Sequence, residues 1–252
     1  MPGVLAGKRA VVTGGSRGIG EATVLELARQ GADVALLVNV SVEQGEEVAR
    51  AAREFGVESF ATQCDVSNPD AVTAAFEQVR ERFGSLEVCV NNAGIVHNAA
   101  AEDLTFDDWS RMLSVNLGSV FLCSQAAGRI MLAQSDGGSI INVSSICAHV
   151  AVRPQKQCHY QAAKGGVNML TKSLAAEWAD RHVRVNTVSP GYVNTALLSQ
   201  MTELHPLWEA QIPMNRLARP QEIAAVITFL ASDGSSYVTG SDFVVDGGYL
   251  TW

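Results

Sequence analysis

Short apolar runs rich in β-branched residues alternate along the chain with longer segments in which apolar residues recur at helical spacing. The short runs predict buried strands, and the longer segments predict amphipathic helices. The predicted strands are residues 9–13, 33–38, 58–64, 86–90, 139–143, 184–189 and 242–246. Strands that alternate with helices of about ten or more residues indicate βαβ units and a parallel sheet. We therefore expect an α/β fold, a doubly wound parallel sheet in a single domain over residues 1–252.

The segments between these strands predict helices, some with recognisable ends. The predicted helices are residues 21–30, 41–55, 68–83, 105–132, 158–180 and 222–231. Ser67 or Asn68 can cap the third of these, and Thr105 with Asp108 resembles a capping box. Residues 196–219 have weak periodicity and contain Pro206 and Pro213. A long irregular segment of this kind is typical of a lid over a binding site.

A glycine-rich turn, Gly14–Gly20 with the sequence GGSRGIG, directly follows the first predicted strand and precedes a helix. Glycines allow a tight turn and a close approach of the backbone to a ligand. The N-terminus of the helix offers free N–H groups to a phosphate. The spacing is neither the Gly-x-Gly-x-x-Gly fingerprint nor a P-loop. We interpret the turn as a ligand-binding turn, and a purely structural turn is the alternative.

Polar residues follow other predicted strands, where ligands bind in parallel sheets. They are Asn39, Asp65 and Asn91–Gly94. In dinucleotide-binding folds an acidic residue after the second strand binds the ribose hydroxyls, whereas basic residues accommodate a 2′-phosphate. Here the second strand ends in Val38-Asn39-Val40-Ser41, which contains neither an acidic nor a basic residue. Asn39 could therefore serve a cofactor with or without the 2′-phosphate.

Tyr160 and Lys164 are four positions apart in a predicted helix and therefore share one face. A phenol has an ordinary pKa of about 10, and a nearby ammonium favours the phenolate and lowers that pKa. A tyrosine beside a lysine is thus a candidate general acid and base for a carbonyl substrate. Taken alone, the pair is more typical of a helix with one aromatic residue and one solvated lysine.

The composition narrows the function classes. The 252 residues carry a net charge of −8, which argues against binding to nucleic acid or to an anionic membrane. The five cysteines show no Cys-x-x-Cys spacing, and the five histidines are not paired at ligand spacing. We expect reduced thiols, a cytoplasmic location and no metal site. No apolar run reaches membrane-spanning length, and the N-terminus does not read as a signal peptide.

Six motifs occur in a fixed order along the chain. They are Gly14-x-x-x-Gly18-x-Gly20, Asn91-Asn92-Ala93-Gly94, Asn116, Ser144-Ser145, Tyr160-x-x-x-Lys164 and Pro190-Gly191-x-x-x-Thr195. Together they closely resemble the short-chain dehydrogenases/reductases, and the resemblance extends from Lys8 to Gly248. It implies a Rossmann-type sheet with the strand order 3-2-1-4-5-6-7, a nicotinamide dinucleotide cofactor and hydride transfer between an alcohol and a ketone.

The resemblance also implies roles for individual residues. Tyr160 would be the general acid in reduction and the base in oxidation, and Lys164 would lower its pKa and bind the nicotinamide ribose. Ser145 would stabilise charge on the substrate oxygen, and Asn116 would hold a water that relays protons to Lys164. The implied cofactor-binding residues are Gly14, Ser16, Arg17, Gly18, Ile19, Gly20, Asn39, Asp65, Val66, Asn92, Ala93, Gly94, Tyr160, Lys164, Pro190, Gly191, Val193 and Thr195.

Two assignments are chosen against an alternative. Ser145 lies 15 positions before Tyr160 (160 − 145), and the slightly shorter gap common in the family would fall on Cys147. We assign the role to Ser145 because it stands at the end of a strand, with Ser144 as the second choice. Arg17 before the middle glycine favours NADP(H), because no acidic residue follows the second strand; NAD(H) remains possible.

The loop before Tyr160 is polar, with His149, Arg153, Gln155, Gln157 and His159. Together with the Gly-Gly-Tyr-x-x-Trp terminus it looks similar to polyol dehydrogenases and ketose reductases of the family. We therefore expect a sugar alcohol or another secondary alcohol as substrate; a merely solvated loop is the alternative. The competing functions are reduction of a 3-oxoacyl thioester and a catalytically silent dinucleotide-binding sensor. The resemblance further implies a homotetramer built through helices 106–132 and 158–180.

Overall fold

The computed structural model describes residues 3–196, 198–199 and 201–252. Seven parallel strands form one sheet with the order β3-β2-β1-β4-β5-β6-β7. The strands are β1 (Arg9–Thr13), β2 (Asp33–Val38), β3 (Ser59–Gln63), β4 (Val88–Asn91), β5 (Gly138–Val143), β6 (Val183–Pro190) and β7 (Asp242–Val245). This order confirms the predicted doubly wound parallel sheet. The central strands of the sheet are apolar on both faces, because helices cover both faces of the sheet.

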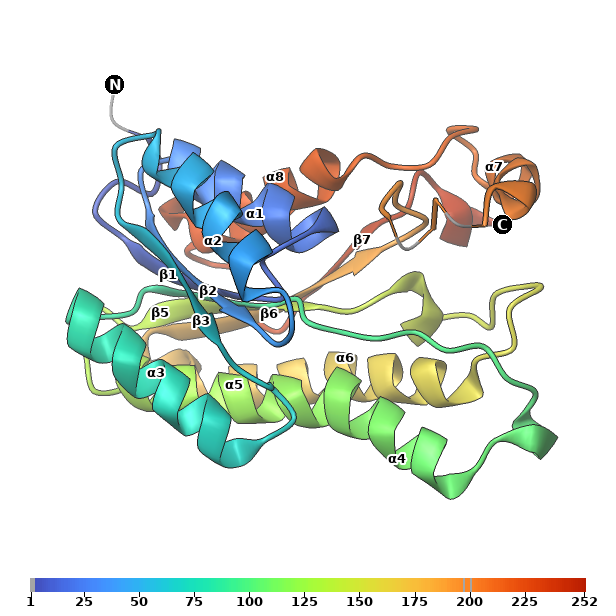
Figure 1. The fold of residues 1–252 in the computed structure, drawn as a ribbon, viewed down its shortest axis with the longest axis horizontal. Coiled ribbons are helices and arrows are strands. Elements are labelled where there is room, and N and C mark those ends of the chain that lie inside the picture. The colour runs from blue at the N-terminus through green and yellow to red at the C-terminus, as the bar shows by residue number, and fades with distance from the viewer. Residues whose placement is uncertain (1–2, 197, 200) are drawn as a thin grey trace.

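Helices lie on both faces of the sheet (Figure 1). They are α1 (Gly18–Arg29), α2 (Val42–Arg53), α3 (Pro69–Phe83), α4 (Phe106–Leu113), α5 (Ser119–Met131), α6 (Cys158–Trp178), α7 (His205–Gln211) and α8 (Pro220–Ala231). One core packs α1, α2 and α8 against the sheet, and a second packs α3, α5 and α6 against the opposite face. Both cores consist mainly of fully buried aliphatic side chains, so burial of these two helix layers stabilises the sheet. No helix of the described residues is long and apolar enough to cross a membrane.

The predicted helix 105–132 is a continuous run of helical residues, but it is not a single α-helix. A five-residue π-helix, Ser114–Gly118, separates α4 from α5 and contains Asn116. Asn116 Nδ2 donates to Ile95 O at 3.0 Å, and Asn116 Oδ1 accepts from Ile95 N at 3.2 Å. The prediction of a continuous helix was therefore wrong at the position where a buried amide binds the loop after β4. Such π-bulges are often associated with functional sites.

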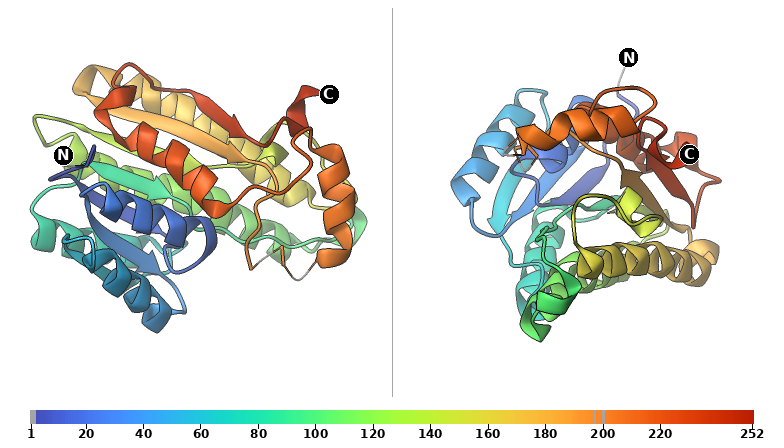
Figure 2. Two further views of the ribbon diagram at one scale, coloured as in Figure 1. Left: turned by 90° about the horizontal axis from the view of Figure 1, so that it is seen from above. Right: turned by 90° about the vertical axis from the view of Figure 1, so that its right-hand side faces the viewer.

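The predicted lid, residues 196–219, contains regular structure that its weak periodicity did not indicate. It includes α7, whose Trp208 is fully buried. Tyr192 stacks on Trp208 with ring centroids 4.6 Å apart, within a third apolar cluster that also contains Ile146, Val152 and Ile212. Residues 197 and 200 of the predicted lid lie outside the described residues. The segment is thus packed onto the loop after β5, and Figure 2 shows α7 at one end of the molecule beside the C-terminus.

Candidate active site

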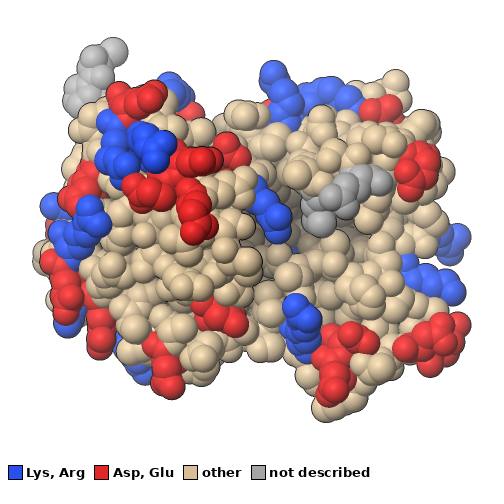
Figure 3. Space-filling view, in the orientation of Figure 1, with Lys and Arg blue, Asp and Glu red and all other residues tan. Residues whose placement is uncertain are grey.

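The carboxyl ends of β4, β5 and β6 meet the starts of α1 and α6 around a cavity of about 240 Å³. Figure 3 shows the molecule hollowed between the part that holds α1 and α2 and the part that holds α7. Eleven of the predicted site residues line the cavity: Ile19, Asn92, Gly94, Asn116, Ser145, Tyr160, Lys164, Pro190, Gly191, Val193 and Thr195. The remaining predicted residues, Gly14, Ser16, Arg17, Gly18, Gly20, Asn39, Asp65, Val66 and Ala93, do not line it. They lie in the adjoining turns after β1, β2, β3 and β4.

The glycine turn is built for close contact between β1, β4 and α1. Gly14 and Gly18 have positive φ angles of 66° and 59°, which glycine adopts without strain. A Cβ on Gly20 would lie 2.1 Å from Gly14 O, so a larger residue there would displace the turn. Asn92 Nδ2 holds the turn from β4 by donating to Thr13 O at 3.0 Å and to Gly14 O at 3.1 Å.

The N-terminus of α1 fits a phosphate. The helix begins at Gly18, three residues before the predicted start at Glu21, so the last two glycines of the turn belong to its first turn. Arg17 is the N-cap residue and makes no side-chain hydrogen bond to the first turn. The first N–H groups of α1 are therefore free of a side-chain cap and can bind an anion such as a pyrophosphate.

The groups that would surround the adenosine half lie after β2 and β3. Asn39 is exposed, and its backbone oxygen accepts from Gln63 Nε2 at 3.2 Å. Arg17 is also exposed, and none of the ion pairs among the described residues includes it. Asp65 accepts from the Ser67 hydroxyl at 2.7 Å and from Ser67 N at 3.0 Å, and these hydrogen bonds lower the pKa of the Asp65 carboxyl. Asp65 thus stays ionised, and Arg17 is a cation free to bind an anion.

Tyr160 and Lys164 lie on one face of α6, and Lys164 Nζ is 5.6 Å from the centroid of the Tyr160 ring. Lys164 is 4% exposed, and its Nζ donates to Val143 O at 2.7 Å. Burial disfavours the ammonium and lowers the pKa of Lys164 to about 8. Burial also raises the pKa of Tyr160, and the nearby Ser145 hydroxyl lowers that pKa by less. The expected lowering of the Tyr160 pKa is thus wrong for this structure, because desolvation of the phenolate dominates.

The two candidate serines point to different partners. Ser144 is buried, and its Oγ donates to Lys164 O at 3.1 Å, which ties the end of β5 to α6. Ser145 Oγ accepts from Cys147 N at 3.1 Å, and Ser145 lines the cavity together with Tyr160, whose pKa it lowers. This geometry favours Ser145 as the hydroxyl beside the reacting oxygen, with Ser144 as a structural contact.

A chain of buried polar side chains runs beneath the site and was not anticipated from the sequence. Asn91 Nδ2 donates to Asn142 Oδ1 at 2.8 Å, Asn142 Nδ2 donates to Thr171 Oγ1 at 2.8 Å, and Thr187 Oγ1 donates to the same oxygen at 2.8 Å. These bonds link β4, β5, β6 and α6. The available signal was a set of polar residues inside otherwise apolar strands, since buried polar groups need partners.

The substrate end of the cavity is less polar than the sequence of the preceding loop. Only Gln155 and Gln157 of its five polar residues line the cavity. His149 Nε2 instead lies 2.7 Å from Asp242 Oδ2, Arg153 is exposed, and His159 is fully buried in the wall. The other lining residues at this end are Ile146, Cys147, Val152, Tyr192 and Leu198, none of which was predicted as a site residue. Of the five polar residues on which the prediction of a polar pocket rested, two glutamines therefore line the cavity.

Among the residues that the structure describes, no group of three or more histidine, cysteine, aspartate or glutamate side chains could hold a metal ion. The chemistry of the lining residues is instead that of hydroxyl, phenol and amine groups. This donor set suits proton transfer and hydrogen bonding to an oxygen substrate.

Comparison with known proteins places this arrangement in a family. A family model described as enoyl-(acyl carrier protein) reductase matches residues 14–250. The chain is 40% identical to a galactitol 2-dehydrogenase from Rhizobium johnstonii, over 98% of this chain and 97% of that protein. It is 41% identical to a 3-oxoacyl-(acyl-carrier-protein) reductase from Staphylococcus aureus, over 96% of this chain and 97% of that one.

A solved structure agrees with these sequence relatives. A short-chain type dehydrogenase/reductase from Mycobacterium marinum superposes with a TM-score of 0.95 at 41% identity, covering 98% of this chain and 96% of that chain. Members of this family use a nicotinamide dinucleotide, and the uncapped helix terminus and the glycine turn fit one. The chain belongs to the short-chain dehydrogenase/reductase family and is an oxidoreductase that acts on CH–OH groups.

Proposed function

We propose that the protein interconverts a secondary alcohol and a ketone with NADP(H), and that a sugar alcohol or another polyol is its substrate. The observation that carries this proposal is the convergence of Tyr160, Lys164 and Ser145 on one cavity that also reaches α1 and the loop after β6. A nicotinamide dinucleotide bound by the glycine turn, Asn92 and Thr195 would supply or accept the hydride.

Each residue has a step that its position supports. In reduction, the Tyr160 hydroxyl gives its proton to the ketone oxygen while Ser145 Oγ donates a hydrogen bond to the same oxygen. In oxidation, Tyr160 takes the proton of the alcohol as a phenolate. The raised pKa of Tyr160 keeps it protonated in the free protein, so oxidation depends on the positive charge of Lys164 nearby. Asn116 holds the loop after β4 in place beside these groups.

The preference for NADP(H) rests on charge. Arg17 has no acidic partner among the described residues and stands at the N-terminus of α1, where a phosphate is favoured. No carboxylate directly follows β2, whose next residues are Asn39 and Val40. A 2′-phosphate would therefore meet one cation and no acidic residue of the β2 turn.

The test follows the absorbance of the reduced nicotinamide during reduction of a ketohexose with NADPH and with NADH, and during oxidation of sugar alcohols and cyclohexanol. We expect turnover with both substrate groups and a preference for NADPH. Arg17→Met should lower kcat/KM for NADPH about tenfold and leave that for NADH unchanged, because one charge-assisted hydrogen bond is lost. A wild type that prefers NADH would contradict the cofactor proposal.

Two other outcomes identify the competing functions. Turnover of an acetoacetyl thioester alone would favour the reductase that the Staphylococcus aureus relative represents. On the face in Figure 3, however, basic and acidic side chains are interspersed, and no large basic patch for an acidic carrier protein is seen. Binding of NADPH without turnover of any substrate would favour the silent sensor.

We also propose a homotetramer built through α4–α5 and α6. Three large apolar side chains of these helices are exposed: Phe106 at 80%, Met169 at 62% and Phe121 at 43%. Exposed apolar residues that gather on neighbouring helices are typical of protein contact surfaces. Light scattering should give four times the mass of the chain, and a monomer mass would contradict the proposal.

A further inference from the structure

The polar side chains that line the substrate end of the cavity differ in whether they can still form a hydrogen bond with a ligand. Tyr192 and Gln155 both line the cavity, but their polar atoms are not available to a ligand there. The Tyr192 hydroxyl is buried without a hydrogen-bond partner among the described residues, and it is not reached from the cavity. The Gln155 carboxamide, with its amide oriented to satisfy both ends, accepts from Trp208 Nε1 at 3.0 Å and donates to Arg153 O at 3.1 Å. Both side chains therefore serve the packing of the lid.

Gln157 differs from both. It is 7% exposed, lines the cavity and is the N-cap residue of α6, yet its side chain does not cap the helix. Its Nε2 instead donates to Cys147 Sγ at 3.2 Å. Among the described residues, no donor forms a hydrogen bond with its Oε1, and this oxygen is not one of the enclosed polar atoms. The oxygen is thus reached from the cavity and has capacity for a ligand.

The position of Gln157 sets which part of a substrate it meets. It stands three residues before Tyr160, directly before α6, and both residues line the same cavity. Cys147, which anchors the amide, is two residues after Ser145. A substrate oxygen held by Tyr160 and Ser145 therefore places the adjacent carbon atoms toward Gln157.

The chemistry of the free atom selects the ligand group. A carboxamide oxygen requires a hydrogen-bond donor, so a ketone or carboxylate at this place would not pair with it. A cationic amine would be disfavoured by the nearby Lys164 ammonium in a largely apolar cavity. A hydroxyl is the group that remains.

We propose that Gln157 is a specificity-determining residue that binds a second hydroxyl, on the carbon next to the reacting carbon, so that the enzyme selects vicinal diols and α-hydroxyketones. Cys147 holds the carboxamide in the orientation that presents Oε1 to that hydroxyl. The inference rests on the proposed alcohol–ketone chemistry, and it adds the group beside the reacting carbon that the site recognises.

The test compares two ring alcohols that differ by one group, cyclohexanol and trans-cyclohexanediol with vicinal hydroxyls. Wild-type kcat/KM should be about tenfold higher for the diol, since the site has a buried acceptor that only the diol pairs. Gln157→Met keeps the length of the side chain and removes the acceptor. It should lower kcat/KM for the diol about tenfold, mainly through KM, and change that for cyclohexanol less than about threefold.

Gln161→Met is the matched control, because it makes the same change one turn further along α6, outside the cavity lining. It should leave the preference for the diol unchanged. If only larger alcohols are oxidised, the two ring alcohols are compared as competitive inhibitors, and the ratio of their inhibition constants should show the same tenfold preference.

Two results would overturn the inference: a wild type that treats both ring alcohols alike, or a Gln157→Met variant that loses the same factor on both. The comparison of the two alcohols with the wild type needs no variant. The proposal can therefore still be contradicted if Gln157→Met does not fold. Failure of the proposed function is distinguishable, because it appears as absence of turnover with every alcohol and ketone.

Discussion

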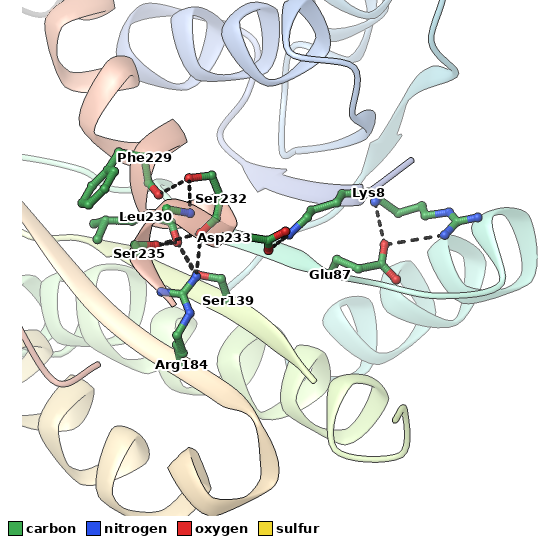
Figure 4. Close-up of polar contacts among 11 residues, drawn as sticks. Lys8, Glu87, Ser139, Arg184, Phe229, Leu230, Ser232, Asp233 and Ser235 are labelled. Atoms are coloured by element: carbon green, nitrogen blue, oxygen red, sulfur yellow. Dashed lines mark hydrogen bonds and ion pairs between the residues drawn. The ribbon is translucent and has the colours of Figure 1, made fainter. Parts of the chain in front are cut away.

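The two ends of the parallel sheet use polar side chains in opposite ways. At the amino end, Arg184 of β6 donates to Leu230 O at 2.8 Å and Val238 O at 3.1 Å, and Ser139 of β5 donates to Leu230 O at 2.8 Å. Figure 4 shows Arg184 and Ser139 beside Leu230 at the last turn of α8, together with the pair formed by Lys8 and Asp233. Carbonyls that end a helix without partners are thus satisfied by side chains of the sheet.

At the carboxyl end, the polar groups keep capacity for a ligand. Lys164 Nζ has one hydrogen-bond partner among the described residues, and Gln157 Oε1 has none. The same sheet therefore carries a stabilising network at one end and incompletely paired groups at the other. Unpaired buried groups cost stability, so we expect substitutions at the carboxyl end to change activity and those at the amino end to change folding.

The largest effect is expected at the carboxyl end. Tyr160→Phe removes the proton that the proposed chemistry transfers, and kcat/KM should fall about a thousandfold. The free energy of unfolding should change by less than about 0.5 kcal/mol, since the ring remains. Steady-state kinetics and urea unfolding measure the two quantities. Tyr237→Phe is the matched control on a fully exposed tyrosine and should change neither; unchanged turnover in Tyr160→Phe would sink the mechanism.

The next effect is expected at the amino end. Arg184→Met keeps most of the aliphatic stem but removes the charged donor to Leu230 O and Val238 O. Leu230 O keeps Ser139 as a donor and Val238 O keeps Asn186. The free energy of unfolding should therefore fall by about 2 kcal/mol, the contribution of hydrogen bonds from a charged group. The kcat/KM of the folded fraction should stay within about twofold of the wild type, because the network is remote from the cavity. Arg181→Met removes an exposed arginine of the neighbouring turn and serves as the control. If Arg184→Met lost activity without losing stability, the expected difference between the two ends of the sheet would be contradicted.

A third prediction concerns the cost of burying Lys164. Its pKa is about 8 in the folded chain and has an ordinary value of 10.5 when exposed. Between these values the unfolded chain keeps a proton that the folded chain has released, so stability should rise with pH. From about pH 7.5 to 10 the wild type should gain about 2 kcal/mol of unfolding free energy relative to Lys164→Met.

The control for this window is Lys172→Met, which removes an exposed lysine of the same helix. Its unfolding free energy should follow the wild type at every pH. The Tyr160 pKa is raised above its ordinary value, so ionisation of that phenol does not contribute below about pH 10. A wild type and a Lys164→Met variant with parallel pH profiles would show that Lys164 is not desolvated.

The difference between the two ends also explains what the sequence could predict. The strands, the sheet order and the assembly of Tyr160, Lys164 and Ser145 follow from local periodicity and ordered motifs, because parallel strands must end at one edge. The pairing of Arg184 with the end of α8 joins residues 46 positions apart and has no local signal. The π-helix at Asn116 likewise depends on a tertiary contact with Ile95.

The orientation of polar side chains was the least predictable feature of the site. Gln155 and Gln157 are two residues apart in one loop, yet Trp208 engages the first and Cys147 the second. The Tyr160 pKa was expected to fall because the sequence shows the neighbouring lysine but not the depth of burial. Solvation depends on the whole fold, so a spacing rule cannot supply it.

The smallest effect separates the two kinds of contact within the amino-end network. Asp233 is 87% exposed, and its pair with Lys8 lies in solvent, so Asp233→Asn should lower the free energy of unfolding by less than about 0.5 kcal/mol. The difference should vanish at about 1 M salt, where charges are screened over about 3 Å. The deficit of Arg184→Met should persist at that salt concentration, because it comes from lost hydrogen bonds to carbonyl groups rather than from a solvated ion pair. Urea unfolding of both variants at low and high salt measures this, and a salt-sensitive deficit in Arg184→Met would mean that charge, not hydrogen bonding, holds the end of α8.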